Sequence, residues 1–212
     1  MREKKLDKRK VQGAETKKKI YKIAERLFAE HHFSDVNIED ITDEAGITKG
    51  AFYVHFESKD ALIALLIADY ASQSDTDYKS FVENLPDDMS SSSVLLALTE
   101  KIADTLANTF GCKNMTKIYQ ILLSGTAGTE AVKGYGRELY ALVYSILEKG
   151  LCSREFTSSL PPETLSRHFV MAIRGVSYEW CVRYPDFDLK EQAIEHVQIL
   201  LKGICFHTNS NS

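Results

Sequence analysis

Residues 37–60, NIEDITDEAGITKGAFYVHFESKD, constrain the fold of this chain most, because they predict two short helices joined by a tight turn. Asn37 is suited to cap the first helix, and the acidic residues behind it favour the positive end of the helix dipole. Gly46 ends that helix, because glycine tolerates the left-handed conformation that a helix C-terminus needs. Thr48 then caps the second helix, and Ser58 caps a third.

The second short helix separates an inner face from an outer face. Phe52 and Phe56 lie four residues apart, so they are predicted to face the core together. The other positions of this helix are mostly small, polar or basic. Because a short helix with such a surface fits the major groove of DNA, this stretch indicates a DNA-recognition helix.

The string DEAGITKGAFYVHFESKDAL resembles the helix-turn-helix signature of TetR-family transcriptional regulators. The similarity extends back through ETKKKIYKIAERLFAEHHFSDV and covers residues 14–66 without a gap. The glycine turn, Thr-Lys-Gly, the aromatic pair and Phe-x-Ser-Lys make the match more specific than a bare helix-turn-helix. The resemblance implies an all-α protein, with an N-terminal three-helix DNA-binding domain and a larger C-terminal helical domain for ligand binding and dimerisation.

Three segments are expected: a disordered basic arm at 1–13, the helix-turn-helix domain at 14–60, and the effector-binding and dimerisation domain at 61–212. The net charge of −4 is unevenly distributed, because residues 1–22 hold ten Lys and Arg against three Asp and Glu. Basic charge in front of a helix-turn-helix is placed to meet phosphates, although a solvated tail without a function is the alternative.

The resemblance implies eight DNA-binding residues: Asn37, Thr48, Lys49, Gly50, Ala51, Tyr53, His55 and Lys59. Lys49 or His55 is expected to read a base, whereas Tyr53 and Lys59 are expected to position the protein on the phosphate backbone. For His55 the alternative is a surface histidine that contacts no DNA.

Beyond the recognition helix, helical periodicity and glycine or proline breaks predict an all-helical body. The first helix is expected at 14–31 and the fourth at about 59–84. Later helices are expected at 93–109, 114–124, 129–150, 162–184 and 188–206.

The segment FVMAIRGVSYEWCVRYPDFDLKEQAIEHVQILLKGI resembles the C-terminal helix pair that forms a four-helix dimer interface in the same family. The apolar positions expected in that interface are Phe169, Ile173, Val176, Ile194, Val197 and Leu201. Burial within a single chain is the alternative for these side chains. In a dimer, two recognition helices about 34 Å apart would fit successive major grooves of a near-palindromic operator.

Regulators of this family usually bind a small molecule in the C-terminal domain, and aromatic walls with a few polar groups suit an apolar or planar effector. The candidate wall residues are Tyr119, Tyr140, Tyr144, His168, Arg174, Tyr178 and Trp180. Ordinary core packing is the alternative for each aromatic residue. His168 and Arg174 suit an anionic group and Glu179 suits a cation, so the sequence leaves the charge of the effector open.

Hydrophobic residues make up 44% of the chain, and the longest apolar run, residues 61–68, is too short to span a bilayer. The charged N-terminus has no signal-peptide pattern, so a cytoplasmic protein without a membrane partner is expected. The four cysteines, at 112, 152, 181 and 205, lack metal-ligand spacing, so they are expected to be small hydrophobes. Neither a metal nor another cofactor is predicted.

These features predict a ligand-responsive, sequence-specific DNA-binding transcriptional regulator. They favour a repressor that a small-molecule effector releases from a near-palindromic operator. The alternatives are an activator or nucleoid-organising protein, an enzyme recruited through its helix-turn-helix, and a module whose helices bind another protein. An enzyme is not predicted, because the chain has no glycine-rich phosphate loop, G-x-S-x-G elbow or H-E-x-x-H motif.

Overall fold

The computed structural model describes residues 2–125 and 128–204. Within these residues the chain is all helical and has no strand, which confirms the predicted fold class. The helices are α1 (Arg2–Glu30), α2 (Ile38–Ala45), α3 (Lys49–His55), α4 (Lys59–Glu83), α5 (Ser91–Asp104), η1 (Thr105–Phe110, a π-helix), α6 (Gly111–Leu123), α7 (Glu130–Lys133), α8 (Glu138–Cys152), α9 (Pro162–Arg183) and α10 (Leu189–Lys202).

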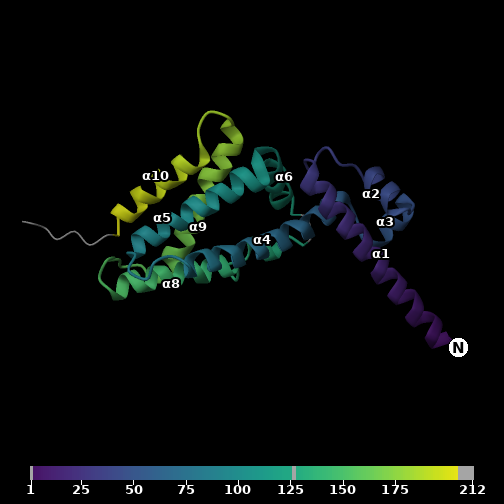
Figure 1. Ribbon diagram of the computed structural model, residues 1–212, viewed down its shortest axis with the longest axis horizontal. Coiled ribbons are helices and arrows are strands. Elements are labelled where there is room, and N and C mark those ends of the chain that lie inside the picture. Colours follow the sequence, from purple (N-terminus) through teal and green to yellow (C-terminus); the bar gives the residue numbers. More distant parts are fainter. Residues whose placement is uncertain (1, 126–127, 205–212) are drawn as a thin grey trace, which may run out of the picture.

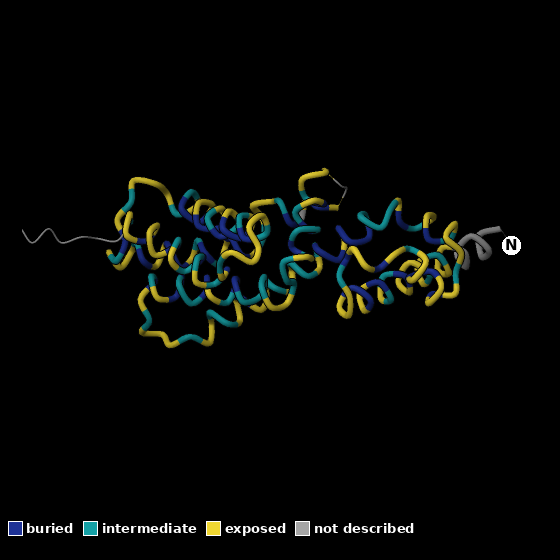
Figure 2. Tube along the Cα trace, turned by 90° about the horizontal axis from the view of Figure 1, so that it is seen from above, coloured by how far each residue is buried: buried dark blue, intermediate teal, exposed yellow. Residues whose placement is uncertain are grey.

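The molecule is elongated, with α1, α2 and α3 at one end and α5 to α10 in a larger helical body (Figure 1). The long helix α4 runs from the first part into the second. Figure 2 shows buried positions along the inner sides of the helices in both parts. Because α4 belongs to both parts, a displacement of this helix in the body would also move its end at the helix-turn-helix.

The core at the α1–α3 end is built from apolar side chains of α1, α2, α3 and the connection between α1 and α2. Ile20, Phe33, Ile41 and Phe52 are almost completely buried there. The same apolar cluster continues through α4 and α6 to Trp180 of α9. A second cluster fills the body between the end of α4, α5, α8, α9 and α10. Because the first cluster crosses from one part to the other, the helix-turn-helix packs on the body through apolar contacts.

The caps of the short helices confirm the predicted boundaries. Asn37 forms a capping box with Asp40, in which each side chain accepts a hydrogen bond from the other residue's backbone N–H. Gly46 adopts the left-handed conformation with φ of 62°. Thr48 and Ser58 each accept a hydrogen bond from the backbone N–H three residues later. These caps satisfy N–H groups that a helix start leaves unpaired.

The prediction of disorder over residues 1–13 is wrong for residues 2–13, because α1 begins at Arg2. This segment has few apolar side chains, which suggested a disordered tail. It is nevertheless rich in Arg and Lys, which are good helix formers, and contains no proline, so helical propensity extends the packed part of α1 toward the N-terminus. In Figure 1 this part of α1 projects away from the body.

Two predicted boundaries in the body are also wrong. The helix expected at 129–150 is divided into α7 and α8, because glycines 134 and 136 interrupt it. The break expected at Gly111 is instead a junction at which η1 joins α5 to α6. Gly111 has φ of 73° there, a conformation outside the helical region that glycine tolerates, and α6 begins at this residue. The end of the helix expected at 188–206 lies partly outside the described residues.

Glu155 caps the start of α5 from a distant part of the chain. Its carboxylate accepts hydrogen bonds from Ser91 N (2.7 Å), Ser92 N (2.8 Å) and Ser92 Oγ (2.6 Å). Burial alone raises the pKa of the Glu155 carboxyl, but these hydrogen bonds outweigh burial and hold the pKa below its ordinary value. Glu155 therefore links the loop after α8 to the positive end of the α5 dipole.

Glu155→Gln should lower the free energy of unfolding by about 1 kcal/mol near pH 7, because an amide is a weaker acceptor at this cap. A lowered folded-state pKa stabilises the protein above the unfolded pKa, and this contribution is lost as the pH falls through the folded pKa. The difference between the two proteins should therefore be constant from pH 6 to 8 and shrink below about pH 4.3. Urea unfolding across this pH range measures the difference, and one that grows at acid pH would contradict the role of the carboxylate.

Candidate nucleic-acid interface and central cavity

The outer face of α3 is the most exposed apolar surface of the helix-turn-helix. Tyr53 is 52% exposed and Val54 is 79% exposed, whereas Phe52 and Phe56 are buried as predicted. Lys49 and Gly50 are exposed at the start of the same helix. Nothing in the described chain covers this face, so it is available to a major groove. The prediction of DNA-binding residues omitted Val54, although its place between Tyr53 and His55 put it among the outward positions.

Two predicted DNA contacts are already engaged within the chain. Lys49 forms an ion pair with Glu39 of α2. The Lys59 ammonium donates hydrogen bonds to the carbonyl oxygens of Phe33 (2.9 Å) and Val36 (2.8 Å), and burial lowers its pKa. Lys59 thus joins the connection before α2 to the start of α4. Its side chain is better explained as a structural tie than as the phosphate contact that the sequence suggested.

His55 is half-buried and faces α1. A Cβ atom added to Gly13 of α1 would lie 3.9 Å from Cε1 of His55. The end of the recognition helix therefore lies beside α1 at this point. Asn37, Thr48 and Ala51 participate in helix caps, where Asn37 and Thr48 supply side-chain oxygens and Ala51 supplies a backbone N–H.

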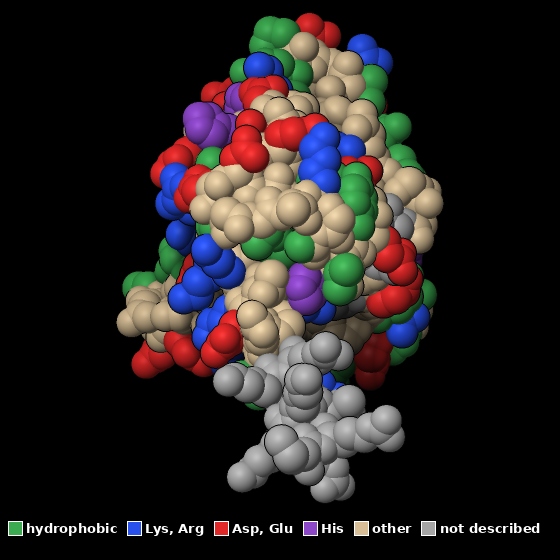
Figure 3. Space-filling view, turned by 90° about the vertical axis from the view of Figure 1, so that its right-hand side faces the viewer, with side chains coloured by type: hydrophobic (Ala, Val, Ile, Leu, Met, Phe, Trp, Pro, Cys, Tyr) green, Lys and Arg blue, Asp and Glu red, His purple; other side chains and the backbone are tan. Residues whose placement is uncertain are grey.

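Beyond residue 22, the helix-turn-helix domain is acidic. Residues 23–60 hold three Lys and Arg against nine Asp and Glu. Figure 3 looks onto this end of the molecule and shows Lys and Arg side chains interspersed with Asp and Glu on the visible face. Attraction to phosphates must therefore come mainly from residues 1–22, where the basic residues are concentrated.

A cavity of about 340 Å³, called the central cavity here, lies between α4, η1, α6, α7, α8 and α9. Its walls are mainly apolar, and Leu106, Phe110 and Ile118 are among them. Two of the seven predicted ligand-binding residues, Tyr119 and Arg174, line this cavity, and the Tyr119 hydroxyl donates to the Arg174 carbonyl oxygen at 3.2 Å. A mainly apolar cavity with few polar groups is typical of a small-molecule site.

The other predicted ligand residues lie elsewhere. His168 lines a separate apolar groove of about 490 Å³ between α9 and α10. Tyr140 and Trp180 are buried in the two apolar clusters, as core packing predicts. Tyr178 is 47% exposed. The Tyr144 hydroxyl donates to Glu148 on the same helix. Of these seven side chains, only Tyr119 and Arg174 reach the central cavity.

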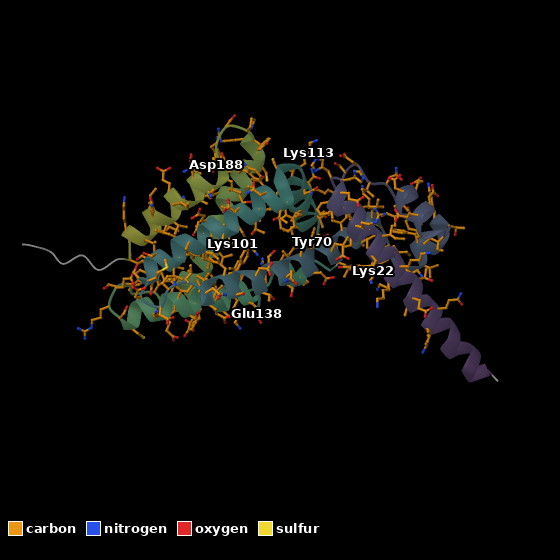
Figure 4. All side chains as sticks on the ribbon, in the orientation of Figure 1. Lys22, Tyr70, Lys101, Lys113, Glu138 and Asp188 are labelled. Atoms are coloured by element: carbon orange, nitrogen blue, oxygen red, sulfur yellow. The ribbon has the colours of Figure 1, made fainter. Side chains whose placement is uncertain are left out.

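A larger hollow of about 750 Å³ lies between the end of α1, α4, η1 and α6. Its walls include charged and imidazole side chains, among them His31, Asp77 and Lys101. Tyr70 of α4 is part of the wall of this hollow and is labelled in Figure 4. The centre of its ring lies 6.0 Å from the centre of the Phe110 ring of η1. This hollow is therefore more polar than the central cavity, with which it shares Phe110.

Helix α6 contacts the central cavity and the helix-turn-helix at the same time. Met115 and Ile118 line the cavity. On the same helix, Asn114 Oδ1 accepts a hydrogen bond from Phe33 N at 3.0 Å, and Lys117 Nζ lies 2.9 Å from the Asp60 carboxylate. A movement of α6 would therefore change contacts at the end of the α1–α2 connection and at the start of α4.

Residues 20–66 match the sequence family described as bacterial regulatory proteins, tetR family. The HTH-type transcriptional regulator AcrR of Shigella flexneri is 25% identical over 202 residues, which are 92% of each chain. The chain belongs to the TetR family.

Other similarities of this TetR-family protein differ in extent. The HTH-type transcriptional regulator YerO of Bacillus subtilis is 42% identical over 71 residues, which are 34% of this chain and 25% of YerO. A solved structure of FadR from Thermus thermophilus, described as a TetR-family repressor in complex with lauroyl-CoA, has a TM-score of 0.70 at 16% identity. That similarity covers 92% of this chain and 98% of FadR, and it establishes the shared fold.

Five of the six residues predicted for a dimer interface are buried within the single chain of this TetR-family protein. These residues are Phe169, Ile173, Val176, Val197 and Leu201. Ile194 is half-buried. These side chains pack in the core of the body, so a partner chain can contact only the exposed side of α9 and α10. The predicted interface residues are therefore corrected, while the interface itself stays a prediction.

The uncovered side of α9 carries a different stripe. Met171 (46% exposed) and Val182 (62% exposed) lie on it, with Tyr178 between them. Gly175 lies in the same stripe, and a Cβ atom there would meet no heavy atom within 4 Å. On α10, Ile199 is 58% exposed. Spacing of three and four residues links Met171, Gly175, Tyr178 and Val182, and this was the signal in the sequence for a second apolar face.

The cysteines do not form a metal site in the part of the chain that the structure describes, where no group of three His, Cys, Asp or Glu side chains has the required arrangement. Burial raises the pKa of the Cys181 thiol to about 11, and the thiol contacts Thr116 and Cys112 of α6. A thiol with this pKa is protonated near neutral pH, so Cys181 packs as a small hydrophobe. Cys205 lies outside the described residues. None of the described helices combines the length and apolar character needed to cross a bilayer.

Proposed function

We propose that this TetR-family protein is a homodimeric, sequence-specific DNA-binding regulator, and that a small-molecule effector releases it from its operator as a repressor. The observation that carries the proposal is the position of α6, which lines the central cavity and contacts the helix-turn-helix. Residues 14–60 would bind DNA, and residues 61–212 would bind the effector and the second chain. We expect the protein to act in the cytoplasm, where an operator on the chromosome would be accessible.

On the DNA side, α3 would enter the major groove through its exposed face. Tyr53 would contact the phosphate backbone, and Val54 would place its methyl groups against a thymine methyl. Gly50 and Ala51 allow the backbone to approach base edges. Lys49 would exchange its ion pair with Glu39 for an acceptor on DNA, which costs little because exposed ion pairs contribute about 0–1 kcal/mol.

On the effector side, a molecule in the central cavity would contact α4, α6 and α9 together. If it fits one position of α6 better than another, it shifts the population toward that position by its difference in affinity. The contacts of Asn114 and Lys117 would transmit the shift to the helix-turn-helix. FadR of Thermus thermophilus, described with bound lauroyl-CoA, is a precedent for a ligand in this fold.

A second copy of the chain would cover the exposed stripe of α9 and the neighbouring part of α10. Gly175 supports this arrangement, since a glycine inside a helix costs about 1 kcal/mol relative to alanine and no contact in the single chain requires it. Close approach of a partner helix would explain its presence. Pairing would place two recognition helices in successive major grooves about 34 Å apart.

Selection of binding sites from a random pool of duplex DNA tests the proposal. The protein should enrich a two-fold symmetric sequence whose half-site centres are about one helical turn apart. The double variant Tyr53→Ala, Val54→Ala should lose the enrichment. Tyr135→Ala, which removes an exposed tyrosine from the α7–α8 connection, should keep it. A pool that shows no enriched sequence after selection would contradict sequence-specific binding.

Deletion of residues 1–12 should reduce the salt dependence of DNA binding, because six of the chain's Lys and Arg residues lie there. Each lost phosphate contact should lower the slope of log affinity against log salt by about 0.9. Anisotropy titrations at several salt concentrations measure the slope. A matched control replaces Lys149 and Lys202, which are exposed on the body, with alanine and should leave the slope unchanged. An unchanged slope after the deletion would exclude phosphate contacts by this segment.

A further inference from the structure

We infer that the central cavity binds a small carboxylate with an apolar body. The inference rests on the proposed function only in taking this cavity as the effector site. It decides the question of effector charge that the sequence left open. The geometry of three basic side chains in the wall carries it.

The charged residues in the wall of the central cavity are all cations. Lys133, Arg137 and Arg174 line it, and no Asp or Glu does. Two carboxylates close in sequence, Glu130 and Glu138, are exposed, and Glu138 lies at the outer side of the body in Figure 4. The cavity therefore carries positive charge that its own wall does not balance.

One of the three cations, Arg137, is neutralised by Asp75, a residue that does not itself line the cavity. Asp75 of α4 forms an ion pair with Arg137, with Nε at 3.1 Å from Oδ2, and its carboxylate also accepts from Leu139 N at 3.3 Å. Among the described residues, neither Lys133 nor Arg174 forms an ion pair with a carboxylate. Two half-buried positive charges thus remain for a ligand to balance.

The two unbalanced cations lie on one side of the cavity. Arg174 Nη2 donates to the carbonyl oxygen of Val132 at 2.8 Å, and Lys133 follows Val132 at the end of α7. The same guanidinium lies 6.0 Å from the centre of the Tyr140 ring. Leu106 and Ile118, from η1 and α6, supply apolar wall. A ligand with its anionic group beside α7 and its apolar body against η1 and α6 would match the basic and apolar sides of the cavity.

The alternatives for ligand charge fit less well. A cation would meet two like charges in a half-buried site, where repulsion is weakly screened. A neutral apolar molecule would cover Lys133 and Arg174 without supplying a counter-ion, which is costly for a charge. A carboxylate would accept charge-assisted hydrogen bonds from both. The volume of about 340 Å³ lies at the lower end of ligand pockets, so the bound part is a small molecule.

Isothermal titration calorimetry with three ten-carbon probes tests the charge: decanoate, decan-1-ol and decylammonium, all below their micelle concentrations. Decanoate should bind at least about tenfold more tightly than decan-1-ol, and decylammonium most weakly. Naphthalene-2-carboxylate in a parallel titration distinguishes an extended apolar body from a planar one. Equal affinity for decanoate and decan-1-ol, tighter binding of decylammonium, or binding of none of the four compounds would overturn the inference.

Two variants assign the effect to the cavity. Lys133→Gln and Arg174→Gln should each weaken decanoate binding by about tenfold and leave decan-1-ol unchanged. Lys149→Gln, on the exposed side of α8, should change neither affinity. Circular dichroism establishes that each variant is folded, and Lys133→Gln, which disrupts no hydrogen bond in the described chain, keeps the test valid if Arg174→Gln unfolds. If both folded variants bind decanoate as tightly as the unsubstituted protein does, the ligand lies elsewhere.

A separate DNA-binding titration with decanoate distinguishes this inference from the proposed function. Release of DNA by decanoate supports both. Tight, Lys133-dependent binding without release supports the ligand class and contradicts the effector role. Release by a cationic or neutral compound that competes for this cavity supports the effector role and overturns the ligand class.

Discussion

Arg137→Met should lower the free energy of unfolding by about 3–5 kcal/mol, because it leaves a buried carboxylate without its partner. The Asp75 side chain is 3% exposed and that of Arg137 is 14% exposed. Two guanidinium nitrogens bind the two carboxylate oxygens, and within the described residues the carboxylate also accepts a hydrogen bond from the Leu139 N–H. Methionine matches the length of the arginine stem but supplies no donor. Urea unfolding followed by circular dichroism measures the loss.

Arg183→Met is the matched control, since the ion pair of Arg183 with Glu179 is exposed on both sides. It should change stability by less than about 1 kcal/mol. The double variant Asp75→Leu, Arg137→Met should recover most of the loss, because neither charge is then left buried. If Arg137→Met is no more destabilising than Arg183→Met, the buried pair does not hold α4 against α8.

Gly150→Ala should destabilise the body by about 3 kcal/mol, because no space exists for a methyl group. An added Cβ would lie 2.3 Å from Cδ2 and Cε2 of the Phe156 ring and 3.0 Å from Cβ of Ser91. Phe156 is only 2% exposed, and its N–H donates to the Gly150 carbonyl at 3.0 Å. The ring therefore cannot move aside without disturbing the core. The midpoint of thermal unfolding should fall accordingly.

Gly175→Ala gives the same chemical change in a helix where no atom lies within 4 Å. In the single chain it should raise stability by up to about 1 kcal/mol, since alanine favours a helix more than glycine does. Similar destabilisation by both variants would show that the crowding around Gly150 is not the cause. A weaker dimer with unchanged unfolding for Gly175→Ala would place a partner chain against α9.

The parts of the fold that local chemistry decides were predictable from the sequence. Asn37, Gly46 and Thr48 act within three or four residues of themselves, so their caps and turn follow from residue type and spacing. The inward pair of Phe52 and Phe56 follows from helical period in the same way. The helix over residues 2–13 is not predictable from low apolar content, which favours disorder, because an existing helix extends at little cost.

The site was less predictable because its residues converge only through tertiary structure. Arg174 was predicted by residue type, but Lys133 at the end of α7 and Arg137 just before α8 meet α9 at the cavity only through tertiary packing, which local periodicity does not reveal. The dimer candidates failed for another reason. Helix α9 has apolar residues on two faces, and spacing alone does not distinguish the core face of Ile173 from the exposed face of Met171.

The DNA-binding role is tested most directly by fluorescence anisotropy of the purified protein on DNA from upstream of its own gene, with scrambled DNA as the control, over a salt series. The proposed function predicts tight, sequence-selective binding at two chains per site, with an affinity that falls steeply as salt increases. Absence of binding to either DNA at low salt would contradict the assignment of α3 as a recognition helix.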